Sequence, residues 1–431
     1  MFRLLSGTTI VLLFSAAAQA DIITLTKIAD RQTPLDQTHL VESINPHDPV
    51  MAAGSVVFNA EGGFPGGFSG WGGIYSGNGI GALTVLHDYD DFIPGLPGQV
   101  FQSFGPPSRG VGPAFRGSRA GWVGIYRGNE KVADLNTRIP GRTENFTGFG
   151  SNPSSSSGGV AFTGSAGTIA SRGLFRWTGD GISTLADTST PALAVSGSLV
   201  SFRDPSSSLD TVAFVANWSN SSDAARGVYL HQNDQLHLLA TASSPRPNGA
   251  GVIGTIGDWV SNSLGTVSFS TSFGVYKADL AHGLQTVVDN TMDVPGGVGK
   301  FSAFSETTSI SGDVVAFLGY DALRNPGLYY AYGGTVHEVI SVGKSIAGAQ
   351  VQQLNITTGA IDGTDIAFRA AFTDGNTAIY KATFTLVPEP ASMISTGLGL
   401  ALTLAWYHRR RRTRRARENP EPPHSHPKSI A

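Results

Sequence analysis

The chain of 431 residues repeats one pattern seven times, at intervals of about fifty residues. One anchor is a small residue followed by an apolar and an aromatic residue. Its copies start at Gly73, Gly124, Gly173, Gly227, Gly274, Gly327 and Ala378. A second anchor, a small-apolar run that ends in phenylalanine, precedes each copy. These residues are Phe58, Phe115, Phe162, Phe214, Phe269, Phe317 and Phe368. Two anchors with one period and one count indicate seven equivalent structural units.

Each unit reads as four short β-runs separated by turns rich in Gly, Ser, Asn and Pro. Four strands in about fifty residues, repeated seven times, are typical of a β-propeller. The predicted fold class is therefore all-β, with a seven-bladed β-propeller over residues 21–386. No long apolar segment with helical periodicity occurs inside this body.

The last repeat predicts how the ring closes. Its third run ends near Phe384, and no fourth run follows before the tail. Residues 26–34 near the N-terminus match residues 184–191, which follow the aromatic anchor of the third unit. We therefore expect the N-terminal strand to complete the last blade and to remove an exposed sheet edge.

Two recurring polar features have structural interpretations. An aspartate follows the aromatic anchor in several units, and turn formation explains a repeated residue better than catalysis does. These residues are Asp30, Asp134, Asp187 and Asp289. The serine-rich stretches 154–157 and 219–222 are predicted to be surface loops between runs.

The first twenty residues match a secretory signal peptide. Arg3 precedes an apolar stretch, and Ala18 and Ala20 stand at the two small-residue positions that a signal peptidase reads. Cleavage there would make Asp21 the mature N-terminus. We expect the protein to be exported.

A second patterned segment lies at residues 387–412. It consists of Pro388-Glu389-Pro390, an uncharged apolar stretch over residues 391–407, and a basic cluster that begins with Arg409, Arg410, Arg411 and Arg412. The stretch predicts a single transmembrane helix near the minimum spanning length, with the arginines on the cytoplasmic side. Residues 413–431 are expected to form a disordered cytoplasmic tail.

This order of motif, apolar segment and arginines resembles the PEP-CTERM sorting segment of Gram-negative bacteria. The resemblance implies processing by an exosortase, an inner-membrane intermediate, and a final location in the cell envelope or outside the cell. Residues 413–431 depart from the pattern, because such tails commonly end soon after the basic cluster. Residues 25–385 resemble an uncharacterised family of bacterial exported repeat proteins, which implies no particular activity.

Composition and charge exclude several function classes. The absence of cysteine rules out disulfides, thiolate metal sites and a cysteine nucleophile. Residues 21–408 carry 20 basic and 30 acidic side chains, which argues against nucleic acid and other anionic polymers as partners. Neutral glycans and cations remain compatible with this surface.

The search for chemical motifs identifies few candidates. No Gly-x-Ser-x-Gly elbow and no metal-ligating histidine spacing occur, so no catalytic residue, resident metal or other cofactor is expected. Asp88, Asp90 and Asp91 form the densest acidic cluster, which we expect to be a solvated loop. Calcium binding is the alternative, because oxygen-rich loops suit this cation, but the turn glycine and the distal glutamate of an EF-hand are missing. Trp71 and Trp122 lie next to aromatic anchors, where they either contact glycans or pack between blades.

Two functional hypotheses follow. The first is a non-catalytic binding or structural protein of the envelope or matrix, whose partners are signal peptidase, exosortase and either an exopolysaccharide or another envelope protein. The alternative is a polysaccharide-active enzyme, a glycoside hydrolase or lyase, on the same scaffold. The alternative requires two carboxylates that converge at one mouth of the propeller.

Overall fold

The computed structural model describes residues 22–35, 39–44, 49–63, 69–110, 112–167, 172–193, 195–218 and 225–386. Residues 1–20, with the predicted signal peptide, and residues 387–431, with the predicted sorting segment and tail, lie outside these ranges. Residues Ile23–Phe384 form one compact unit. Within the described ranges all regular structure is β-strand, and no helix long and apolar enough for a membrane span is found.

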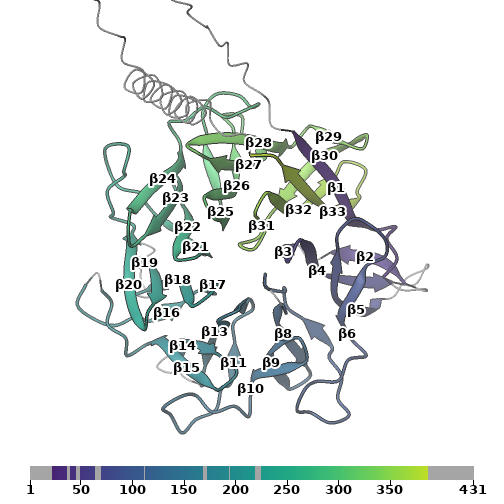
Figure 1. Ribbon diagram of the computed structural model, residues 1–431, viewed down its shortest axis with the longest axis vertical. Coiled ribbons are helices and arrows are strands. Elements are labelled where there is room, and N and C mark those ends of the chain that lie inside the picture. Colours follow the sequence, from purple (N-terminus) through teal and green to yellow (C-terminus); the bar gives the residue numbers. More distant parts are fainter. Residues whose placement is uncertain are drawn as a thin grey trace, which may run out of the picture. The chain divides into compact units, whose positions relative to one another are not determined.

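The strands form seven antiparallel sheets, which follow one another along the chain as the blades of a propeller (Figure 1). Blade 1 contains β2 (Leu40–Ile44), β3 (Val50–Ala52), β4 (Ser55–Gly63), β5 (Ser69–Gly77) and β6 (Thr84–Asp88). Blade 2 contains β7 (Ser103–Phe104), β8 (Ala114–Arg119), β9 (Trp122–Arg127) and β10 (Glu130–Asp134). Blade 3 contains β11 (Gly148–Phe149), β12 (Ser154–Ser156), β13 (Gly159–Ser165), β14 (Arg172–Trp177) and β15 (Ile182–Asp187).

The next three blades repeat this order. Blade 4 contains β16 (Ser201–Phe202), β17 (Ser206–Ser208), β18 (Thr211–Asn217), β19 (Arg226–Gln232) and β20 (Gln235–Thr241). Blade 5 contains β21 (Ile256–Ser263), β22 (Thr266–Thr271), β23 (Gly274–Asp279) and β24 (Gly283–Asp289). Blade 6 contains β25 (Ala303–Ser311), β26 (Val314–Tyr320), β27 (Pro326–Tyr332) and β28 (Thr335–Ser341).

The seventh blade combines both ends of the propeller, as the repeat pattern predicts. From the C-terminal side come β29 (Ser345–Ile346), β30 (Ala349–Asn355), β31 (Ile361–Asp362), β32 (Asp365–Phe372) and β33 (Thr377–Phe384). Its outer strand is β1 (Ile23–Asp30), which pairs antiparallel with β33 from Ile23 opposite Phe384 to Asp30 opposite Ala378. The predicted all-β fold, the seven blades and the closure by the N-terminal strand are confirmed.

The pairing of β1 reproduces a detail of the other blades. The outer strand of blades 1–6 carries one extra residue opposite the aromatic triplet; in blade 3 it is Leu185, and in blade 4 it is Leu239. In blade 7 the register shifts in the same place, at Ile28. Because a bulge increases local twist, the shared bulge gives β1 the twist of a regular outer strand.

The two sequence anchors are cross-strand neighbours in every blade. Each anchor phenylalanine on the second strand lies opposite the anchor aromatic residue on the third; Phe214, for example, faces Tyr229 with ring centroids 5.5 Å apart. The seven pairs have centroid separations between 5.5 and 6.2 Å. Such buried pairs stabilise a sheet beyond the area that they bury.

The glycine of the aromatic anchor has a steric role. At Gly73 an added Cβ would lie 2.2 Å from the carbonyl oxygen of His87, and at Gly274 it would lie 2.5 Å from that of Val288. Both carbonyls belong to the bulged outer strand. At these two positions the bulge brings backbone so close that a Cβ would clash, whereas the equivalent position of blade 7 is Ala378.

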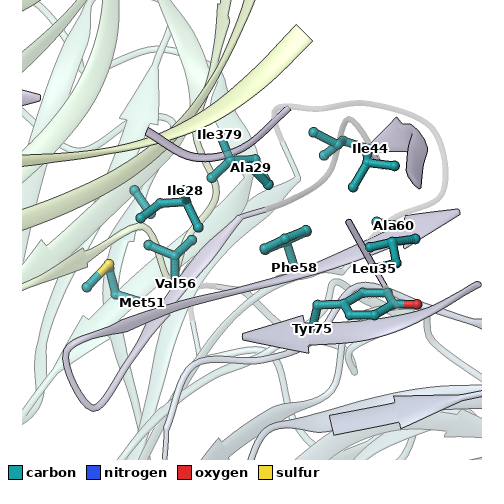
Figure 2. Packing of buried hydrophobic residues seen from close by; sticks show 12 residues of the cluster. Ile28, Ala29, Leu35, Ile44, Met51, Val56, Phe58, Ala60, Tyr75 and Ile379 are labelled. Atoms are coloured by element: carbon teal, nitrogen blue, oxygen red, sulfur yellow. The ribbon is translucent and has the colours of Figure 1, made fainter. Parts of the chain in front are cut away.

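The hydrophobic core lies between blades. One cluster joins Ile28 and Ala29 of β1 and Ile379 of β33 to Phe58 of β4 and Tyr75 of β5, so that blade 7 packs on blade 1 (Figure 2). Similar clusters join blades 1 and 2, 2 and 3, 3 and 4, 4 and 5, and 5 and 6. Each sheet therefore buries its apolar faces against the neighbouring sheets. Because the ring is closed, every blade has a neighbour on both sides.

Candidate functional site

The first strand of each blade borders the central channel. In blades 1, 3, 4 and 7 this strand consists of two parts that pair with the same second strand, as β16 and β17 both pair with β18. The short second parts β3, β17 and β31 lie at the centre of the ring (Figure 1). On the second strand of each blade, one residue directly precedes the anchor phenylalanine. We call the residue of the first strand that pairs with it the belt position. From blade 1 to blade 7 it is Val50, Ser108, Ser154, Ser206, Ser261, Ser309 and Ala360.

Serine hydroxyls at the belt position join neighbouring blades. The hydroxyl of Ser154 accepts a hydrogen bond from the backbone N–H of Ser207 at 2.8 Å, one residue beyond the belt position of the next blade. Ser206, Ser261 and Ser309 accept in the same way from Asn262, Ile310 and Ile361 at 3.0 to 3.1 Å. In blade 7, where Ala360 has no hydroxyl, the carbonyl oxygen of Gly359 accepts from Met51 of blade 1 at 2.8 Å.

A second row of serines repeats the arrangement two residues further on. Ser208, Ser263 and Ser311 accept from backbone N–H groups of the following blades at 2.9 to 3.0 Å. We call both rows together the hydroxyl belt. Ser154 and Ser155 are buried in β12, so the predicted surface loop at residues 154–157 is wrong for these residues. Residues 219–222 lie outside the described residues.

Blade 2 interrupts the belt. After β7, the described residues of its inner segment, 105–110 and 112–113, form no strand, and Ser108 accepts instead from the backbone N–H of Ala114 in its own blade. Next to Ser108, the guanidinium of Arg109 donates hydrogen bonds to the carbonyl oxygens of Asn262 and Ile310 at 2.8 and 3.0 Å. Because these residues belong to blades 5 and 6, Arg109 spans the channel at the level of the belt.

A cavity of about 340 Å³ lies at the channel mouth on one side of the belt, and all seven blades contribute to its wall. We call the residue two places before the belt position the rim position. In blades 2 to 7 the rim residues are Pro106, Asn152, Asp204, Trp259, Thr307 and Thr358. Thus the belt repeats one residue type in five of seven blades, whereas the rim carries a proline, an amide, a carboxylate, an indole and two hydroxyls.

Burial shifts the pKa of the rim carboxylate. Asp204 accepts hydrogen bonds from Asn152 Nδ2 at 2.9 Å and from Thr163 Oγ1 at 3.2 Å. Burial nevertheless raises the pKa of Asp204 above its ordinary value, because loss of solvent outweighs these bonds and the nearby charge of Arg203. Glu306, next to the rim residue of blade 6, is exposed and also lines the cavity.

Arg109 carries the opposite charge at the inner end of the cavity. Burial lowers the pKa of its guanidinium, while the charge of Asp362 acts in the other direction. No carboxylate of the described residues lies within 4.0 Å of this guanidinium. Among the described residues, the groups that compensate its charge are two carbonyl dipoles and more distant acids such as Asp362.

The tryptophans singled out in the sequence do not line this mouth. Trp71 on β5 stacks on the ring of His39 with centroids 5.3 Å apart, and it packs against the core between blades 7 and 1. Trp122 on β9 donates through Nε1 to the hydroxyl of Tyr126 at 3.4 Å. These contacts agree with packing between blades, and a contact of either tryptophan with glycans stays a prediction.

The aspartates singled out in the sequence stabilise turns. Asp88 accepts a hydrogen bond from the backbone of Asp90 at 2.9 Å, and Asp91 lies 2.8 Å from Nδ1 of His87. Among the described residues, no group of three or more His, Asp or Glu side chains could hold a metal ion. The recurring Asp30, Asp134, Asp187 and Asp289 each accept from the backbone N–H two residues on at 2.8 to 3.0 Å, which confirms their interpretation as turn formers.

Sequence reasoning overlooked the rim residues Asn152, Asp204 and Trp259 and the channel residue Arg109. A third repeat could have identified them. Proline precedes the belt position in blades 1 to 4, and serine occupies that position in blades 2 to 6. Aligning the Pro-Ser pairs of blades 2 to 4 places Pro106, Asn152 and Asp204 directly in front of the pairs, and Arg109 directly behind the first of them. Trp259 has no such pair behind it and is found only by its spacing from the anchor phenylalanine.

These observations define the class of the molecule: a seven-bladed β-propeller with a uniform inner belt and a varied channel mouth. Residues 108–281, less than half of the chain, match the model of a family described as a family of unknown function, DUF7453. No curated protein matches the chain.

Solved structures resemble the chain only distantly. They include a chain of a mitotic checkpoint complex, with 10% identity, a TM-score of 0.33, and coverage of 81% of this chain and 94% of that one. A puromycin hydrolase has 11% identity, a TM-score of 0.38, and coverage of 77% and 59%. A puromycin-hydrolyzing peptidase from Mycobacterium tuberculosis has 10% identity, a TM-score of 0.33, and coverage of 76% and 57%. This chain therefore spans less than two thirds of either hydrolase. The fold assignment rests on strand pairing and not on these likenesses.

Proposed function

We propose that the protein is an exported, non-catalytic binding protein of the cell envelope or matrix that recognises its ligand at the channel mouth. The observation that carries the binding role is the varied rim around a cavity of about 340 Å³. This volume falls within the range of about 300–1,000 Å³ typical of ligand pockets. The belt beneath it is occupied with inter-blade hydrogen bonds, so the scaffold is rigid where the rim is supported.

The destination is part of the same proposal. The support is the sequence pattern at both ends: Ala18 and Ala20 before Asp21, and Pro388-Glu389-Pro390 before the apolar segment and arginines. Signal peptidase and an exosortase would process the chain, with an intermediate in the inner membrane. The ligand would then be an exopolysaccharide or a surface group of another envelope protein.

Fractionation of cells that produce the full chain tests the destination. A variant with Pro388, Glu389 and Pro390 all replaced by alanine should accumulate in the inner-membrane fraction, whereas the unaltered chain should reach the outer envelope or the medium. A matched variant with alanine at Pro420, Glu421 and Pro422 keeps the motif and should behave like the unaltered chain. Equal distribution of the two variants would contradict sorting through this motif.

A glycan array with the full chain, with and without calcium, tests the binding role. Specific binding that persists after chelation would fit the polar rim, since the described residues offer no metal-ion cluster. Binding that requires calcium would point to the acidic loop at Asp88–Asp91 instead. If no array ligand binds and the soluble propeller assembles with an envelope protein, a display role would replace ligand recognition.

One observation favours a polysaccharide-active enzyme as a second candidate. Asp204 and Glu306 both line the mouth, and burial raises the pKa of Asp204, as glycoside chemistry requires of a general acid. Release of reducing ends from a bound polysaccharide would support this candidate, provided that Asp204→Asn and Glu306→Gln each abolish the release. Release that survives both substitutions would assign the activity to another site or to a contaminant.

A further inference from the structure

Arg109 introduces a positive charge into a channel whose construction does not require it. The hydroxyl belt joins blades 3 to 7 and blade 1 through neutral hydroxyls and backbone groups. The residue that follows the belt position is uncharged in the other six blades. In blade 2 it is Arg109, whose side chain reaches across the channel. Burying a guanidinium away from water costs folding free energy unless its charge is compensated. Among the described residues no carboxylate lies within 4.0 Å of this guanidinium, and its two hydrogen-bond acceptors are neutral carbonyls. The cavity wall thus contains a cationic group although residues 21–408 are acidic as a whole.

The hydrogen bonds of Arg109 leave capacity for a ligand. A guanidinium has five N–H donors in a planar fork, and the structure assigns one bond from Nη1 and one from Nη2. The acceptors, the carbonyls of Ile310 and Asn262, are uncharged. A planar anion in the cavity could therefore receive further bonds from the same guanidinium.

The rim supplies the other contacts that a sugar ring needs. Trp259 lines the cavity and is partly exposed, so its apolar surface is available for stacking. Asn152, Thr307 and Thr358 add neutral polar groups at equivalent positions around the mouth. Asp204 accepts hydrogen bonds from Asn152 and Thr163. The carboxylates of Asp204 and Glu306 in the cavity wall are acceptors, which match hydroxyl donors of a ligand better than a second anionic centre.

The two carboxylates of the cavity wall, Asp204 and Glu306, disfavour anions of higher charge. A singly charged carboxylate beside Arg109 is repelled less by Asp204 and Glu306 than a doubly charged phosphate would be. An aromatic surface, hydroxyl-binding acceptors and one cation at the inner end together match a pyranose that carries a carboxylate. We propose that the mouth binds a uronate residue of an acidic glycan, with its carboxylate on Arg109 and its ring on Trp259. This inference rests on the proposed binding function.

Titration calorimetry on the full chain tests it with two matched ligands: an oligo-uronate and the same oligosaccharide after reduction of its carboxyl groups. The oligo-uronate should bind at least about tenfold more tightly, and its affinity should fall with added NaCl while that of the reduced ligand does not. Arg109→Gln should remove the difference between the two ligands. Trp259→Ala should weaken both ligands by a similar factor.

Arg176→Gln is the matched control. Arg176 also crosses between blades, where it donates to the carbonyls of Gly158 and Asp210 at 2.9 and 3.1 Å, but it does not line the mouth. Its substitution should leave both affinities unchanged. If Arg109→Gln does not fold, Arg109→Lys and the NaCl dependence of the unaltered chain decide the question. The lysine should keep the salt dependence and lose part of the affinity.

The outcomes separate this inference from the proposed function. Equal binding of both ligands, or equal losses in Arg109→Gln, would overturn the uronate while a glycan-binding mouth stands. Displacement of the oligo-uronate by inorganic phosphate at equal concentration would show recognition of an anion alone and would also overturn it. Cleavage of the oligo-uronate would overturn the non-catalytic function but not the site. Failure of both ligands to bind would overturn the inference. The proposed destination would then still be tested by cell fractionation.

Discussion

The belt and the rim surround the same channel two residues apart, yet they differ in kind. The belt has serine in five of seven blades, and its hydroxyls are bonded to neighbouring backbone. The rim positions of blades 2 to 7 carry five different residue types, from Pro106 to Trp259. Equivalent positions under one structural demand converge on one residue type. The residue types at the rim vary, so the construction of the propeller does not determine them. This difference is the basis of the binding proposal.

The largest expected effect concerns the closed ring on which this comparison depends. Deletion of residues 21–36 removes β1 and exposes the edge of β33 and the buried core around Ile28 and Ala29. We expect a loss of more than about 4 kcal/mol in the free energy of unfolding, spread over the whole ring. Chemical denaturation measures it.

A truncation of equal length at the other end, residues 416–431, is the control, because it lies outside the unit Ile23–Phe384. It should unfold like the complete chain. If the N-terminal truncation does so too, β1 does not hold the ring closed.

Next in size is the contribution of a single belt hydroxyl. Ser261 accepts from the backbone of Ile310 at 3.1 Å and donates to the carbonyl of Thr358 at 2.6 Å. Ser261→Ala leaves a buried N–H without its acceptor, so we expect a loss of about 1–3 kcal/mol in unfolding free energy. Glycan affinity should not change. A stable variant with altered affinity would erase the distinction between belt and rim.

The reciprocal variant lies two residues away in the same blade. Trp259→Ala removes the indole from the mouth but no belt contact, so thermal stability should change by less than about 1 kcal/mol. Glycan affinity should fall at least about tenfold in calorimetry. The pair Ser261→Ala and Trp259→Ala thus separates stability from binding, and a large melting change in the tryptophan variant would assign it to the scaffold.

The smallest effect is the pH dependence contributed by Asp204. Because its pKa in the folded protein is raised, this carboxyl favours folding most below the ordinary value of 3.8, and the contribution is lost as pH rises through the raised pKa. The unfolding free energy of the native chain, relative to Asp204→Asn, should therefore be greatest at acidic pH and decline toward neutrality. A difference that grows with pH would mean that the hydrogen bonds from Asn152 and Thr163 dominate instead.

The sequence predicted the fold well because the fold is repetitive. Phe214 and Tyr229 could be paired in advance since every unit repeats them at one spacing, and the match of residues 26–34 to residues 184–191 revealed the origin of the last strand. The mouth was harder, because a recognition site breaks the repeat and has no period to detect. Trp71 was selected by its distance from an anchor, which does not report whether a side chain faces the channel or a neighbouring blade. Arg109 lies in the inner segment of blade 2, whose described residues after β7 form no strand, so no strand pattern in the sequence marks its position.

The pairing of Ile23 with Phe384 also sets the order of folding. A ribosome makes the first of these strands at the start of the propeller and the second at its very end, so the ring cannot close until synthesis of the propeller is complete. Contacts between such distant segments form late, since the intervening loop must first be brought together. Until then the nascent array has unpaired edges at both ends, where it is exposed to aggregation and to chaperones. For this molecule the last blade, and not the first, decides when a chain becomes a stable protein.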